Sequence, residues 1–354
     1  MANEIEKLNT IAIADIEKFN GKTDNNIEKL NAFEFTGTVD PLFAGTRAVI
    51  AGGTGGTHAD QNTIAYKTLG ASADTVDFGD LQSYRSLMNG AGSNISRAIF
   101  AGGLSTGDGS SSVIYGVTDT DYITVGSTGD ATDFGNLQTA RAYGTGGGAS
   151  NGTLLFSTGG GNQLPGESFV TLNSMEYFTI ASTGTGTDAG NLSATNSNNT
   201  QTDGNTRYIS AGGGDASTVD TMEYNDFSTS ANVSDFGDLG AAAKKGSSAA
   251  SVTRAVFQCG LYDGSNGTNV MEFVTVASTG NATDFGNLDT GVEEAGGTSN
   301  GTLGEFFGGT NSGGTGQNVC QKITIASTGN ASDTGDIAHA PSSRITAVAA
   351  TSGT

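Results

Sequence analysis

Tryptophan is absent from this sequence of 354 residues, and proline, cysteine and histidine are scarce, with 3, 2 and 2 residues. The scarcity of proline argues against a proline-rich linker or a low-complexity disordered chain. The two cysteines, Cys259 and Cys320, are too few for the disulfide framework of a small secreted domain. We expect both to be buried free thiols.

Basic residues are also few: Lys and Arg number 15 against 36 Asp and Glu, a formal net charge of −21 at pH 7. Nucleic acids and anionic membranes both attract basic surfaces, so neither partner is expected. No apolar run approaches the roughly 20 residues that span a bilayer. The N-terminus lacks the basic start and apolar stretch of a signal peptide, so we expect no membrane insertion and no standard secretion.

Glycine, in contrast, is abundant, with 56 residues, and it marks two repeated motifs. The first motif has the form Asp-Phe-Gly-Asn-Leu and occurs six times, with variation, at intervals of 47 to 56 residues. An Asp precedes the central residue of every copy, and a Gly follows it. The central residues are Phe78, Phe134, Ala189, Phe236, Phe285 and Thr334.

The second motif is a short β-type run that ends in Gly-Gly or Cys-Gly. Its six copies span residues 47–53, 97–103, 154–160, 207–213, 254–260 and 303–309. An alternating apolar and polar strand, such as 122–125, lies between the two motifs and usually ends in a Ser-Thr-Gly turn. A small-residue strand such as 241–250, suited to a crowded axis, precedes the second motif.

Each repeat therefore predicts four short antiparallel strands, and six such repeats predict an all-β, six-bladed β-propeller over residues 46–354. The first unit lacks a small inner strand before Arg47, whereas residues 344–351 form a surplus strand of that type. We expect the C-terminal strand to pair with the Arg47 strand and close the ring.

The repeat resembles the Kelch family, whose blades carry an apolar run ending in Gly-Gly, then a Tyr, an aromatic residue and an Arg. One unit contains Gly102-Gly103, Tyr122, Phe134 and Arg141 at these positions. The resemblance covers roughly residues 46–354 and implies a Kelch-like propeller. The chain departs from the family in its lack of Trp and in Thr334 at the aromatic position of the last unit.

Residues 1–45 form an N-terminal arm of different character, with the unit Ile-Glu-Lys-Leu/Phe-Asn repeated at 11 residues. Eleven residues is the period of a right-handed helical supercoil, but turn formers such as Asn20-Gly21 also permit short strands joined by turns. Neither structure buries its apolar residues alone, so we expect the arm to dock on a partner. The predicted anchoring residues are Ile5, Leu8, Ile16, Phe19, Ile27 and Leu30.

The arm also resembles N-terminal segments of virion structural proteins of tailed bacteriophages, in which Ile-x-Lys-Leu-Asn units precede a larger module. The repeat Thr-Gly-Asn-Ala-Thr-Asp-Phe-Gly-Asn-Leu at 279–288 is similar to structural proteins of marine cyanobacterial phages. The resemblance implies a tail-fibre, tail-associated or capsid decoration protein of the virion. It also implies many copies per assembly and contact of the arm with other virion proteins.

The sequence carries no recognisable catalytic motif. The only histidines, His58 and His339, lie in a glycine-rich loop and after the last repeat, where we expect surface residues. The acidic residues Asp108, Asp119 and Asp121 precede one strand but form no 12-residue calcium loop. We therefore predict no enzyme activity, no metal and no cofactor.

The segments of variable length that follow each Gly-Gly run are expected to cluster on one face of the ring, where ligand contacts are common. They span 54–62, 104–121, 161–174, 214–221, 261–270 and 310–319. The two longest supply Tyr115, Asp119, Asp121 and Gln163 as candidates for binding a host-surface glycan or protein. Two alternatives stay open: a polysaccharide-degrading enzyme on a propeller scaffold, and a non-viral Kelch-like interaction protein.

Overall fold

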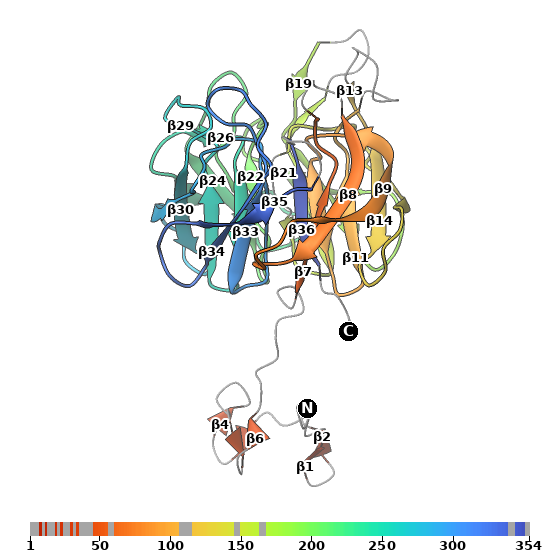
Figure 1. Cartoon of the computed structure of the whole chain (residues 1–354), viewed down its shortest axis with the longest axis vertical. Helices are drawn as coiled ribbons and strands as arrows, with labels where there is room; N and C mark the ends of the chain where they lie inside the picture. Colours follow the sequence, from red (N-terminus) through yellow and green to blue (C-terminus); the bar gives the residue numbers. More distant parts are fainter. Residues whose placement is uncertain are drawn as a thin grey trace. The chain divides into compact units, whose positions relative to one another are not determined.

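A computed structural model describes residues 45–55, 60–105, 115–144, 149–162, 168–338 and 344–350, together with six short strands before residue 35. The chain divides into two compact units, residues 1–40 and 41–354. All regular elements of the described residues are β-strands, and the larger unit is the predicted six-bladed propeller (Figure 1).

Six four-stranded antiparallel sheets, which we call blades I to VI, form the ring. Blade I has the strand order β36(Thr346–Ala350), β7(Arg47–Ala51), β8(Gln61–Thr68), β9(Val76–Arg85). Blade II has the order β10(Gly90–Ser93), β11(Arg97–Ala101), β14(Asp119–Thr124), β15(Thr132–Asn136). Blade III has the order β16(Ala149–Ser150), β17(Leu154–Thr158), β20(Ser174–Thr179), β21(Thr187–Asn191). Blade IV has the strand order β22(Thr200–Gln201), β23(Tyr208–Ala211), β24(Thr221–Asn225), β25(Ser234–Asp238). Blade V has the order β27(Ser247–Ala250), β28(Arg254–Gln258), β30(Val270–Thr275), β31(Thr283–Asn287). Blade VI has the order β32(Gly296–Ser299), β33(Leu303–Phe307), β34(Val319–Thr324), β35(Ser332–Asp336).

The C-terminal strand closes the ring as the sequence predicted. β36 pairs antiparallel with β7, with Val348 opposite Val49. Blade I is thus built from both ends of the propeller sequence, which leaves no open edge at the junction of the first and last repeats.

The hydrophobic core is divided among the interfaces between adjacent blades. Phe134 of blade II is 2% exposed and contacts Tyr122 of its own blade and Phe178 of blade III, with ring centroids 5.9 and 5.7 Å apart. Burying one such aromatic side chain contributes about 1.5–3 kcal/mol. Each blade therefore buries its apolar side chains against its neighbours.

The invariant Gly of the Asp-Phe-Gly motif permits a close approach between blades. Gly286 has a φ of +134°, and a Cβ added there would lie 2.5 Å from the carbonyl oxygen of Gly329 in the next blade. In return, the Gly329 N–H donates to the carbonyl of Phe285 over 2.7 Å. Related backbone hydrogen bonds join all six pairs of adjacent blades, including Thr75 N–H to Asp336 across the closing interface, at 3.0 Å.

The interface between blades VI and I, which we call the closing seam, differs chemically from the others. Thr334 occupies the position that Phe fills in four blades, and Glu305 and Lys67 occupy positions where blade II has Ile99 and Ile123. The Lys67 Nζ lies 2.8 Å from Glu305 Oε1, and both side chains are at most 1% exposed. At these positions a buried ion pair thus replaces the apolar side chains that blade II carries.

The described residues of the smaller unit form three hairpins, each made of two-residue strands, at the 11-residue spacing. They pair β1(Lys7–Leu8) with β2(Ile11–Ala12), β3(Lys18–Phe19) with β4(Lys22–Thr23), and β5(Lys29–Leu30) with β6(Phe33–Glu34). Of the two structures that the sequence left open, the strand alternative holds. Leu8, Phe19 and Leu30 lie in first strands of these hairpins, whereas Ile5, Ile16 and Ile27 lie outside the described residues.

Candidate binding face

One face of the propeller carries the connections between the second and third strands of each blade, and we call it the loop face. The connection from the fourth strand to the next blade lies on the same face, because it pairs with these loops at Ser86↔Leu104, Ala142↔Gly161, Ser197↔Gly214 and Glu293↔Thr310. The small strands β13(Tyr115–Gly116), β19(Val170–Thr171), β26(Ala243–Lys244) and β29(Leu261–Tyr262) extend at this end of the ring (Figure 1).

Two of the four predicted binding residues lie on the loop face. Tyr115 is half-buried in β13, which pairs with β12(Leu104–Ser105), and Asp119 is exposed at the first position of β14. Gln163 lies outside the described residues. A ligand-binding role for these three residues stays a prediction.

Asp121 lies in the blade interior. The sequence predicted it in the variable segment 104–121, but β14 already begins at Asp119. It is 2% exposed, and its Oδ2 lies 2.5 Å from Nη2 of the buried Arg85 at the end of β9. Burial raises the pKa of Asp121, although Arg85 opposes the shift. Asp121 therefore joins blade II to blade I, and its carboxylate is engaged within the protein.

The same position carries a structural polar group in the next four blades, which sequence reasoning missed. Arg141 donates to Glu176 over 2.7 Å, and Tyr262 donates to Glu272 over 2.8 Å. Gln321 exchanges hydrogen bonds with the Thr290 backbone. The signal was present in the sequence as an acid or amide directly before the Tyr, Phe or Lys of the third strand in blades II to VI.

Six non-glycine residues with left-handed backbone surround the propeller axis on the loop face. Their φ angles lie between +47° and +60°, a region that side chains other than Gly rarely adopt. Five backbone hydrogen bonds of 2.7–3.1 Å join them in series, from one interblade connection to the next. They are Leu87, Tyr143, Asn198, Lys245, Glu294 and Arg344.

The charged side chains of this axial ring are paired with one another. The Lys245 Nζ lies 3.1 Å from Oε1 of Glu293 and from Oε1 of Glu294, and the Arg344 Nε lies 3.0 Å from Oε2 of Glu294. Burial lowers the pKa of Lys245, but the two carboxylates outweigh it and the net shift is upward. The two cations are therefore neutralised locally, and this arrangement stabilises the axial ring more than it offers charge to a ligand.

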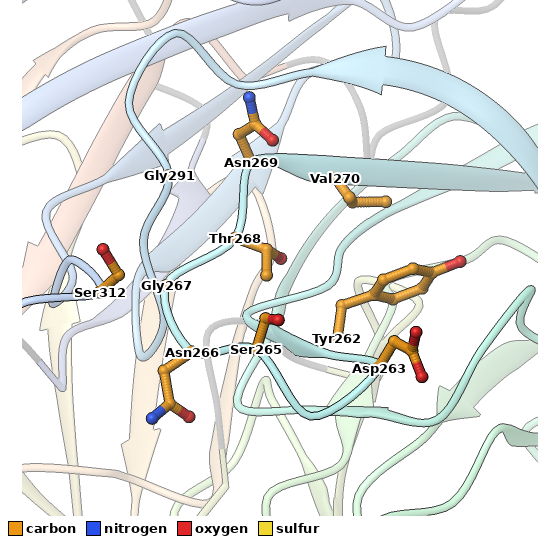
Figure 2. A pocket seen from close by; sticks show the side chains of 10 residues that line it. All are labelled: Tyr262, Asp263, Ser265, Asn266, Gly267, Thr268, Asn269, Val270, Gly291 and Ser312. Carbon is orange, nitrogen blue, oxygen red and sulfur yellow. The ribbon is translucent and has the colours of Figure 1, made fainter.

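A pocket of about 560 Å³ opens on the loop face between blades V and VI (Figure 2). Most of its wall comes from the segment between β29 and β30, and Gly291 and Ser312 contribute from two other connections. The half-buried Tyr262 is the one aromatic residue among its described lining residues. The remaining lining residues are Asp263, Ser265, Asn266, Gly267, Thr268, Asn269 and Val270.

Backbone contacts shape this pocket. Tyr262 and Ser265 exchange two backbone hydrogen bonds of 2.9 Å around the tight turn at Asp263-Gly264. A Cβ added at Gly291 would lie 2.5 Å from the carbonyl oxygen of Gly267. Because these segments already touch through their backbones, the pocket does not depend on flexible side chains for its form.

The described residues contain no group of three or more His, Cys, Asp or Glu residues placed to hold a metal ion. Cys259 and Cys320 are buried free thiols, as predicted, and burial raises the pKa of Cys320 to about 12. His58 and His339 lie outside the described part of the chain. Across the described ranges, no helix is long and apolar enough to cross a membrane.

Comparison with known proteins adds no relationship: no protein-family model matches the sequence, and no curated protein shows significant similarity to it.

Proposed function

We propose that this chain is a virion structural protein of a tailed bacteriophage that displays a Kelch-like propeller for binding a host surface or a partner. Its arm, residues 1–45, anchors the protein to other virion proteins, and the loop face makes the outward contact. The protein is present in many copies as a tail-fibre, tail-associated or capsid decoration component.

The direction of the first propeller strand is the observation that carries this proposal. β7 begins at Arg47, and its other end leads into the connection that lies on the loop face. The chain therefore enters the propeller at the face opposite the loops. Attachment through the residues before Arg47 therefore does not pass through the loop face, which supports a contact role for that face.

The engagement of buried polar groups supports binding rather than catalysis. Arg141, Glu176 and Asp121, which are ionisable and deeply buried, hold neighbouring blades together. A catalytic acid or base has to reach a substrate from within a cleft, and these groups face other blades instead. The strongly acidic composition is consistent with a display protein that avoids nucleic acid.

Mass spectrometry and immunogold labelling of purified phage particles test the anchoring role. The full chain is expected in particles, and a chain that lacks residues 1–40 is expected to fold but to be absent from them. Absence of the full chain from particles overturns the proposal. Release of reducing ends from host polysaccharide by the purified protein favours the alternative of a depolymerase, because an adhesin binds without trimming.

A further inference from the structure

The pocket between blades V and VI carries polar side chains that the fold does not use. Asp263, Ser265, Asn266, Asn269 and Ser312 are exposed. Within the described part of the chain, none of these five side chains takes part in a hydrogen bond or an ion pair. Two amides, two hydroxyls and one carboxylate therefore line an open cavity (Figure 2).

The aromatic residue of the pocket is held in a fixed orientation. The Tyr262 hydroxyl donates to Glu272 Oε1 over 2.8 Å, and the ring packs on the core cluster around Phe257 and Val274. Burial and the adjacent Glu272 raise the pKa of this phenol, so it stays protonated and keeps its donor. An amphipathic ring fixed at both ends offers an apolar surface beside the polar groups.

The charges of the pocket select among ligand classes. Among the described residues no Lys or Arg lines it, and the one ionisable lining group besides Tyr262 is the carboxylate of Asp263. Phosphate, sulfate and uronate ligands would meet a negative group without a countercharge, in a protein of net charge −21. A metal ion would find one carboxylate where several oxygen ligands are needed.

We propose that this pocket binds a neutral saccharide. Sugar hydroxyls both donate and accept hydrogen bonds, which matches amide, hydroxyl and carboxylate groups, and the C–H face of a sugar ring matches a partly exposed Tyr. The site is formed by segments 261–270 and 310–319 together with Gly291, on the loop face. This inference rests on the proposed binding role and names its ligand class.

The test applies full-length protein to a printed array of neutral oligosaccharides and their sialylated, sulfated and uronate counterparts. We expect retention on neutral glycans, and at least about tenfold weaker binding for the double variant Asn266→Ala/Asn269→Ala. The matched control is Asn205→Ala, an exposed asparagine between β22 and β23 on the opposite face. Equal melting temperatures for the three proteins show that folding is unchanged.

Each outcome separates the saccharide inference from the proposed function. No retention, retention on acidic glycans alone, or equal binding by the double variant overturns the inference. Those results leave the virion role intact if the chain is found in particles. Absence from particles together with neutral-glycan binding that the double variant loses overturns the virion role and retains the saccharide site.

Discussion

The closing seam provides the sharpest test of how the ring is held together. Lys67 Nζ donates to Glu305 Oε1, Thr334 Oγ1 and the Thr334 carbonyl over 2.8, 3.1 and 3.3 Å. Glu305 also accepts from the Gly70 N–H over 2.7 Å. Changing Lys67 to Met leaves the Glu305 carboxylate buried without its cation. Breaking such a pair costs about 3–5 kcal/mol, a large part of the roughly 5–15 kcal/mol of a folded domain.

The other blades supply the control. The triple variant Lys67→Ile/Glu305→Ile/Thr334→Phe gives the seam the residues that blade II has at the same positions. Well-packed apolar replacement of a buried pair is neutral or stabilising by about 1–4 kcal/mol. Urea unfolding monitored by tyrosine fluorescence measures both changes. Loss of less than about 1 kcal/mol in Lys67→Met, or a triple variant as unstable as the single one, refutes this account of the seam.

Three further predictions concern the ring. Gly286→Ala places a Cβ against the next hairpin at a φ of +134°, and should cost more than about 2 kcal/mol in urea unfolding. Gly184→Ala has open space and should change little; equal effects would contradict the close-approach argument. Burial raises the pKa of Asp203 from 3.8 to about 7, although the Ser150 N–H favours the ionised form. Stability should therefore fall as pH rises from about 4 to 7, by at most about 1.4 kcal/mol per unit. Asp203→Asn should flatten that slope in unfolding curves at several pH values, and an unchanged slope removes Asp203 as its source. Deletion of residues 344–354 removes β36 and should abolish cooperative thermal unfolding, whereas an unchanged melting curve would show that closure by β36 is dispensable.

The ring itself was predictable because each structural demand recurs six times in the sequence. A single Asp-Phe-Gly is weak evidence, but Gly79 and its five counterparts meet the same requirement, an approach by the hairpin of the next blade. The tail strand was recognisable since its small residues matched the inner strands. The local pairing of the N-terminal hairpins was not, because an 11-residue period fits helix and hairpin alike.

The candidate site was less accessible from the sequence. Asp121 was placed in a loop because its partner, Arg85, belongs to the preceding repeat and becomes a neighbour only in the ring. The saccharide pocket uses a segment that the sequence had marked as variable, but its wall also needs Gly291 and Ser312 from other connections. The left-handed φ of residues such as Leu87 could not be predicted from the neighbouring sequence, because such side chains do not favour that backbone conformation.

The pairing of β36 with β7 also sets the order of events during synthesis. The edge of β7 emerges from the ribosome early, yet its inner partner is completed only with residues 346–350. Until then, every nascent chain exposes one unpaired strand edge that matches the tail of any other copy. Polysomes that crowd these chains together would favour exchange of tails between neighbours, so the emergence of β36 is the step at which each chain can close its own ring.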